Sequence, residues 1–304
     1  MQNLHAKWRT EFARDLTKHL LTFEGIEAIV IAGSVARGYA DEYADVEIAI
    51  FWDTLPSDTT RHAIVSALHA DFLYAYDGPA REDQLLIHGL QIDLWHISVT
   101  HQEEILDAVL HKHHFDLSTL NALDTIRSCI PLYGHEIIEG WKLRAQAYPD
   151  ELAEKIVREH IGSFSTGELS ILTQRNNPTV FHARLSFLQQ EIFLVLMALN
   201  RSYFPAFKWL YRALESMQVK PEAIDSRFRR AFEVSSEEAI ADTKLLLEET
   251  LHLAERQFPQ IDTAPIYRRL NYVRAAHEAP IDPQVSKKNL PRKQLPAQTN
   301  DFSG

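Results

Sequence analysis

The stretch AGSVARGYADEYADVEIAIFW, residues 32–52, decides how this chain folds. It leaves one apolar run at Gly33-Ser34, passes through ten further residues and enters a second apolar run at Asp45-Val46-Glu47. On a strand, side chains alternate between two faces, so Asp45 and Glu47 share a face. Two carboxylates there repel each other by about 4 kcal/mol at ~4 Å with an effective dielectric near 20. Either water screens this pair or a cation holds it together.

Length and composition describe an ordinary globular protein. The chain has 304 residues, 45% of them hydrophobic and 24% charged, a length that suits two packed domains. Its net charge of -11 disfavours non-specific binding to nucleic acid, which needs clustered Lys and Arg. The single cysteine suits a reducing compartment, and we find neither an apolar leader nor the ~20 apolar residues of a membrane span. We therefore expect a cytoplasmic protein without a membrane partner.

The pattern of apolar residues divides the chain into an α+β half and a helical half. Apolar spacing predicts helices over residues 3–23 and 58–76, strands over 26–33 and 46–52, and two strands meeting around Gly89 within 84–98. From about residue 101 the strand signals stop, and only helical patterns follow, the strongest over 179–200. We expect a small mixed sheet flanked by helices in domain 1–134, a helical-bundle domain over 135–278 and a poorly ordered, proline-rich tail over 279–304.

Two further features raise the prospect of a site at the Asp45–Glu47 pair. Gly33 ends a strand and permits close backbone approach to a ligand, while Ser34 supplies a hydroxyl; a capped turn is the structural alternative. Asp93 lies within the apolar run LQIDLWHI, where an acid is costly to bury without a partner. If that strand lies beside 46–52, Asp93 is a third carboxylate, and three acids suit one or two divalent ions. His96 should point to the opposite face.

These residues resemble the signature of the nucleotidyltransferase-fold superfamily of DNA polymerase beta and the small bacterial nucleotidyltransferases. That signature is Gly-Ser, about ten residues, Asp-x-Asp/Glu and a third acid on a later strand, and the match covers about 70 residues. The order of an α+β domain before a helical domain looks most like the aminoglycoside, streptomycin and lincosamide nucleotidyltransferases. One departure is Glu47, where the commoner residue is Asp.

The resemblance implies a role for each matched residue. Gly33 and Ser34 would contact the β- and γ-phosphates of a nucleoside triphosphate, most often ATP. Asp45 and Glu47 would hold Mg2+, and Asp93 would be either a third metal ligand or the base that deprotonates the acceptor hydroxyl. A nucleoside monophosphate would pass to that hydroxyl, with release of pyrophosphate.

A triphosphate also needs cations from the protein. Lys208 lies in the unusually apolar segment FPAFKWL just after Pro205 and is our candidate from the helical half; a lysine extending from a core helix to solvent is the alternative. Arg37, in the loop after Ser34, is a second candidate. A small-molecule acceptor fits the acidic composition best, while a protein acceptor, as in toxin-antitoxin relatives, and a non-catalytic nucleotide-binding module stay open as alternatives.

Overall fold

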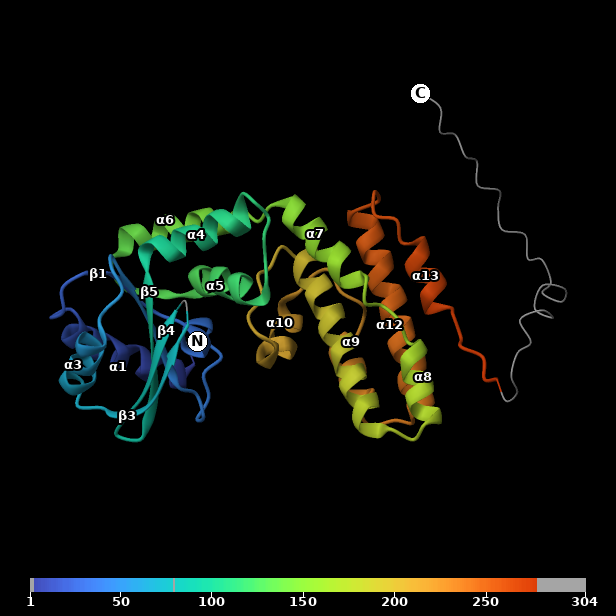
Figure 1. Cartoon of the computed structure of the whole chain (residues 1–304), viewed down its shortest axis with the longest axis horizontal. Coiled ribbons are helices and arrows are strands. Elements are labelled where there is room, and N and C mark those ends of the chain that lie inside the picture. Colours follow the sequence, from blue (N-terminus) through green and yellow to red (C-terminus); the bar gives the residue numbers. More distant parts are fainter. Residues whose placement is uncertain (1–2, 79, 278–304) are drawn as a thin grey trace, which may run out of the picture.

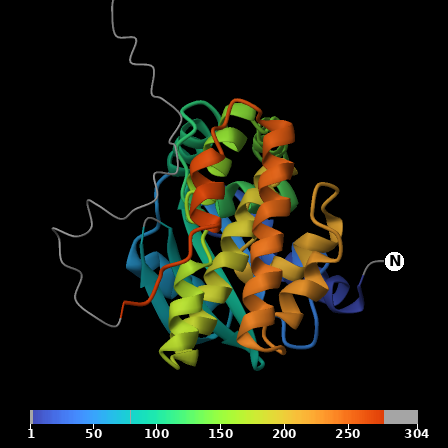
Figure 2. The same ribbon diagram turned by 90° about the vertical axis from the view of Figure 1, so that its right-hand side faces the viewer.

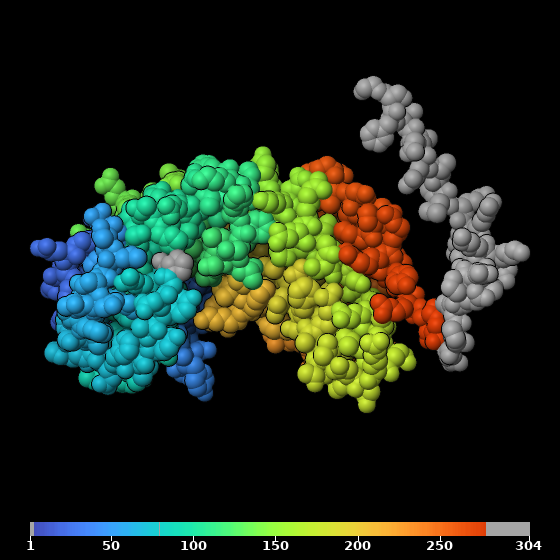
Figure 3. All heavy atoms as spheres, viewed as in Figure 1, coloured from blue at the N-terminus to red at the C-terminus, as the bar shows by residue number. Residues whose placement is uncertain are grey.

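A computed structural model of the chain describes residues 3–78 and 80–277. The chain forms an arch, with a sheet and its helices at one end and a group of long helices at the other (Figures 1 and 3). Helices α6 (His135–Gln146) and α7 (Asp150–Ile161) lead from the first half to the second. The tail expected over residues 279–304 lies outside the described residues.

The sheet is mixed and has six strands in the order β3-β4-β5-β2-β1-β6. All neighbours are antiparallel except β2 and β5, which are parallel. The strands are β1 (Ile26–Ile31), β2 (Val46–Trp52), β3 (Asp71–Asp77), β4 (Arg81–Ile87), β5 (Leu90–Ser98) and β6 (Ile130–Tyr133). Every residue of β2 is buried, as expected for a central strand covered on both faces.

Helices cover both faces of the sheet. Helices α1 (Leu4–Leu20) and α3 (Asp58–Ala67) pack on the face that carries Ile48 and Ile50. Helices α4 (Val99–Leu110), α5 (Leu117–Ser128) and α6 (His135–Gln146) pack on the opposite face, which carries Ala49 and Phe51. Side chains on alternate faces of β2 therefore belong to two separate hydrophobic cores.

The helical half is built around α9, which packs against α7, α8 and α12. Figure 2 looks along the arch with these helices in front of the sheet. The helices of this half are α7 (Asp150–Ile161), α8 (Gly167–Gln174), α9 (Pro178–Leu199), the 3-10 turn η1 (Phe207–Trp209), α10 (Leu210–Ser216), α11 (Ile224–Arg230), α12 (Ser236–Gln257) and α13 (Ala264–Leu270). One continuous core runs from this half into the α4–α6 layer, so the two halves share apolar contacts.

Two sequence-based expectations about local structure were wrong. The helix expected over 58–76 ends at Ala67, and β3 follows, because the four-residue spacing of Ile64, Leu68 and Phe72 imitates a helix face. His69 has a φ of 50°, a left-handed conformation that ends the helix there. Strands also continue beyond residue 101, since β6 pairs with β1; its Pro131 suits an edge strand and obscures the strand signal.

The fold class is as expected: α+β, with a helix-flanked mixed sheet and a helical C-terminal part. The two strands predicted to meet around Gly89 are β4 and β5, and the strand predicted over 46–52 is β2. Over residues 3–78 and 80–277, none of the helices combines the length and apolar character needed to cross a membrane.

Candidate active site

Glu47 and Asp93 lie side by side at the centre of the sheet. They are direct Cα partners in the parallel pairing of β2 with β5, so their side chains share one face. Both are buried, Glu47 with 6% and Asp93 with 7% of its surface exposed. Asp93 accepts a hydrogen bond from the side-chain amide of Gln91 at 3.0 Å. The sequence predicted this meeting only on the condition that the two strands are neighbours, which they are.

Both carboxyl groups have raised pKa values. Burial raises the pKa of Glu47 to about 7, the charge of Asp45 adds to this effect, and Lys208, Arg37 and the Ser34 N–H oppose it. Burial also raises the pKa of Asp93 to about 6, with the Asp45 charge again acting in the same direction. Asp45, directly before β2, is therefore close enough to influence both acids. Perturbed acids clustered in this way are typical of functional sites.

The Gly33-Ser34 turn packs directly onto Glu47. Gly33 has a φ of 60°, and a Cβ atom added there would lie 1.2 Å from Oε2 of Glu47. The Ser34 backbone N–H donates to the same oxygen at 3.1 Å. Oγ of Ser34 is buried and has no hydrogen-bond partner among the described residues. Glycine is needed here both for its conformation and for the space it leaves, and the buried hydroxyl keeps unused hydrogen-bonding capacity beside Glu47.

The loop between the turn and β2 is held by α1. Arg9 is 2% exposed, and its guanidinium donates to the carbonyl of Ala44 at 2.9 Å and to that of Glu42 at 3.4 Å. The side chain of Asn3 donates to the carbonyl of Ala40. These bonds fix the backbone just ahead of Asp45, so the long gap in the motif is an ordered loop.

Lys208 reaches the site from the helical half. It lies in η1, and its Nζ is 3.9 Å from Oε1 of Glu47, while the lysine side chain is 61% exposed. The residue two positions earlier, Ala206, has a φ of 85°, a strained value for a residue with a Cβ atom. The turn that aims Lys208 at the carboxylates is thus maintained against backbone strain.

Arg37 occupies a different position. It ends the short helix α2 (Gly33–Arg37), and its guanidinium forms an ion pair with Asp124 on α5, with Nε 2.9 Å from Oδ2. This pair connects the Gly33-Ser34 turn to the layer of helices above the sheet. Nε and Nη2 are engaged by Asp124, so a contact of Arg37 with phosphate would use Nη1 or require the guanidinium to turn.

The chemistry of the donors suits Mg2+, although the acids are not gathered into a ready-made cage. Among residues 3–78 and 80–277, no three acidic, histidine or cysteine side chains lie close enough together to hold a metal ion. Glu47 instead faces the Ser34 N–H and Lys208. Its oxygens, those of Asp45 and Asp93 and the unpartnered Ser34 hydroxyl are hard donors of the kind Mg2+ binds. A cation would also offset the repulsion from Asp45, which adds to the effect of burial on the two pKa values.

Sequence reasoning missed the polar neighbours of the two acids. Gln91 shares the face of Asp93 on β5, while Gln84 is the Cα partner of Asp93 on β4. The period-two pattern of Glu82 and Gln84 was the available signal, but it has meaning only once β4 is known to pair with β5.

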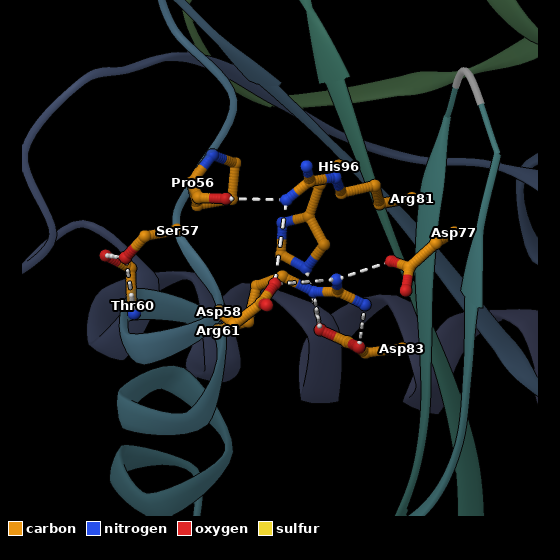
Figure 4. A network of polar contacts seen from close by, with 9 residues as sticks. All are labelled: Pro56, Ser57, Asp58, Thr60, Arg61, Asp77, Arg81, Asp83 and His96. Atoms are coloured by element: carbon orange, nitrogen blue, oxygen red, sulfur yellow. Dashed lines mark hydrogen bonds and ion pairs between the residues drawn. The ribbon is translucent and has the colours of Figure 1, made fainter.

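The opposite face of the sheet carries a buried structural network (Figure 4). His96 lies on that face, as expected from its spacing to Asp93, and is fully buried. The Trp52 indole N–H donates to its Nδ1 at 3.2 Å, and its Nε2 lies 3.1 Å from Oδ2 of Asp83. Arg61 of α3 bonds Asp83 through two nitrogens and reaches Asp77 at 2.8 Å. This network attaches α3 to the back of the sheet, away from Glu47 and Asp93.

Comparison with known proteins finds similarity among solved structures. No protein-family model matches the chain, and no curated protein matches it. Solved structures similar to it include a nucleotidyltransferase-like protein from Exiguobacterium sibiricum 255-15, at 9% sequence identity and a TM-score of 0.40. The match covers 80% of this chain and 73% of that one. Similarity at this level assigns neither a family nor a reaction, so the function must be inferred from the side chains of the site.

Proposed function

We propose that this chain is an Mg2+-dependent nucleotidyltransferase that moves a nucleoside monophosphate, AMP from ATP, onto a hydroxyl group of a small molecule. The observation that carries the proposal is what meets at Glu47: its in-register partner Asp93, the Ser34 N–H and the Lys208 ammonium group. Carboxylates attract a divalent ion, while N–H and ammonium groups bind phosphate oxygens. Holding a triphosphate through a metal ion needs both kinds of group in one place.

Each residue has a part in the proposed reaction. Gly33 and Ser34 contact the terminal phosphates, and Lys208 offsets part of their charge. Asp45 and Glu47 hold the metal ion, which, when bound, supplies the remaining neutralisation of the triphosphate. These residues act by positioning and by electrostatic stabilisation, the two effects that dominate phosphoryl transfer.

Asp93 is proposed to receive the proton. The acceptor hydroxyl oxygen forms a bond to the α-phosphorus, and the bond from that phosphorus to the oxygen bridging to the β-phosphate breaks. Pyrophosphate leaves with that electron pair, and the hydroxyl proton passes to the carboxylate of Asp93. A pKa of about 6 leaves this carboxyl mostly ionised at neutral pH and still able to hold a proton transiently.

A transfer assay tests the proposal. The chain is incubated with Mg2+, ATP and a panel of hydroxylated small molecules, and products heavier by one adenylyl group are detected by mass spectrometry. Asp45→Asn should lower transfer at least a hundredfold, on the order of what a single electrostatic contact contributes. Glu42→Gln, in the exposed part of the same loop, should leave it unchanged.

The other outcomes separate the alternatives. Unchanged transfer by Asp45→Asn would refute the site. Adenylylation of a co-expressed protein, with none of the small molecules modified, would support a protein acceptor. Saturable ATP binding without transfer to any acceptor would support a non-catalytic module.

A further inference from the structure

Two neighbouring rows of side chains cross one face of the sheet. Cα pairing places the first row in register from β2 to β3 and comprises Glu47, Asp93, Gln84 and Tyr74. The second row is paired in the same way and comprises Ala49, Trp95, Glu82 and Tyr76. Residues two apart on a strand share a face and lie ~7 Å apart. The second row is therefore the immediate neighbour of the carboxylate row.

A cavity lies over the second row. It has a volume of about 250 Å³ and is enclosed by the sheet on one side and by residues of α4 and α5 on the other. Trp95 and Tyr76 line it, and Tyr76 is 56% exposed at the outer edge. Pockets for whole drug-sized ligands measure roughly 300–1,000 Å³, so this one has room for a single ring system. Aromatic side chains on the sheet favour a flat ring.

One polar group in the cavity lacks a partner. Gln102 of α4 lines the cavity and is 2% exposed. Its Nε2 has no hydrogen-bond partner among the described residues. A buried N–H donor left without a partner is destabilising, and native structures rarely keep one without a reason. A ligand that places an acceptor atom in the cavity would satisfy this donor.

The charge of the cavity limits what can enter. Among the described residues that line it, Glu82 is the only charged one, and one of its oxygens accepts a hydrogen bond from Gln84 at 2.9 Å. Its charge extends to the neighbouring row, where it adds to the rise in the pKa of Asp93. An anionic ligand would be repelled, whereas a ring with an ammonium group would be attracted.

The order of the strands says which substrate lies here. The Gly33-Ser34 turn follows β1, Glu47 is on β2 and Asp93 is on β5, so the proposed phosphate contacts are on the β1 side of the acids. The cavity extends from Ala49 and Phe51 on β2, across Trp95 on β5, to Tyr76 at the β3 edge. Its outer edge at Tyr76 lies on the opposite side of Asp93 from the proposed phosphate contacts, and an acceptor hydroxyl would approach Asp93 from that side.

We propose that this cavity binds the acceptor substrate through a flat ring that carries a hydrogen-bond acceptor and a cationic group. The inference rests on the proposed nucleotidyl transfer and adds the class of molecule that receives the nucleotide. Gln102 donates to the ring substituent, Glu82 pairs with the cation, and Trp95 provides the surface on which the ring packs. Asp93 lies two residues before Trp95 on β5 and therefore on the same face of the sheet.

Two matched small molecules test the assignment. Tyramine has a phenol ring with an ammonium group, and 4-hydroxyphenylacetate has the same ring with a carboxylate. In ligand-observed NMR titrations, tyramine should bind at least about tenfold more tightly, since one close charge interaction can supply that factor. Glu82→Gln should bring the two affinities together.

Variants of the cavity lining show whether binding occurs there. Gln102→Leu should weaken tyramine about fivefold, the effect of one hydrogen bond, without lowering the Tm, because the amide it removes has no partner. Ala122→Leu, which fills the cavity from α5, should abolish binding. Glu104→Gln serves as the control, because this acid of α4 is 71% exposed and does not line the cavity.

The outcomes distinguish this inference from the proposed function. Tyramine that does not bind, or binds equally well to Ala122→Leu, would overturn the cavity assignment even when Mg2+ and ATP bind normally. Displacement of tyramine by adenosine would overturn it as well, because the cavity would then hold the nucleobase. Failure of ATP to bind, with tyramine binding intact, would instead refute nucleotidyl transfer and with it the acceptor role.

Discussion

Oε1 of Glu47 lies 3.9 Å from Nζ of Lys208, so the central strand of the sheet and the helical half meet at one ion pair. The pair is asymmetric, because the carboxylate is buried and the ammonium group is 61% exposed. Such a lysine contributes little to stability but is free to turn toward a ligand. Lys208 is thus placed to neutralise negative charge on a ligand that binds beside Glu47.

Replacing Lys208 should weaken nucleotide binding and leave folding intact. Lys208→Gln removes a charge from the proposed phosphate site, so we expect the Kd for Mg2+·ATP to rise about tenfold. The Tm without ligand should stay within about 1 °C. Isothermal titration and a thermal melt measure the two effects. Arg212→Gln, a 60% exposed cation of α10 that pairs with Glu215, is the control and should bind ATP normally.

Replacing Glu47 should stabilise the fold and destroy the site. Burial and the Asp45 charge disfavour its ionised form, so Glu47→Gln should raise the Tm at pH 8 by roughly 2–4 °C. The same variant should lose the stabilisation that Mg2+·ATP gives to the wild type. A lower Tm at pH 8 would contradict the electrostatic account of this residue.

The two left-handed glycines of α2 and its cap provide a matched comparison. Gly33 has a φ of 60° and faces Glu47, whereas Gly38 has a φ of 72° and open space where a Cβ atom would lie. Gly38→Ala should cost about 1–2 kcal/mol from backbone strain alone. Gly33→Ala should cost more and also abolish nucleotide binding, since Glu47 must move. Equal losses of stability from chemical denaturation, with ATP binding kept in both variants, would contradict the close packing of the turn.

Metal affinity and stability should depend on pH in opposite directions. The folded-state pKa values of Asp93 and Glu47, about 6 and about 7, lie above the ordinary 3.8 and 4.5. The folded protein therefore binds more protons than the unfolded chain, and the stability these groups contribute is lost as pH rises through 6 and 7. Over the same interval the carboxylates ionise, so Mg2+ affinity should increase. Titration calorimetry and thermal melts from about pH 5 to 8 check both trends.

The network behind the sheet should govern acid stability. Burial raises the pKa of Asp83, but hydrogen bonds from His96 and Arg61 outweigh it and hold the pKa at about 2. Its stabilising contribution is present above the ordinary value and is lost as pH falls toward 2. Asp83→Asn should cost about 3–5 kcal/mol, because it leaves Arg61 buried with reduced compensation. Asp77→Asn, at the 70% exposed partner of Arg61, should cost less than about 1 kcal/mol by urea denaturation.

Local patterns were enough to predict part of this structure. The side-chain pattern of residues 46–52 predicted a strand, which is β2. Gly89, within the stretch 84–98, separates β4 from β5 as predicted. Where a pattern has two physical interpretations, prediction failed: the helical spacing of Ile64, Leu68 and Phe72 continues into a strand, and Pro131 masks β6. The partner of an edge strand is distant in the chain, so its own residues carry a weak signal.

By itself the sequence determined that residues 46–52 form a strand and that the Gly33-Ser34 turn precedes it, because alternation and turn chemistry are properties of adjacent residues. Only the tertiary structure decided that Asp93 pairs with Glu47, that Lys208 reaches it from the helical half and that Arg37 pairs with Asp124. Strand order and helix packing bring these groups together through hydrogen bonds and burial between segments far apart in the chain. No local pattern records which of those segments will be neighbours.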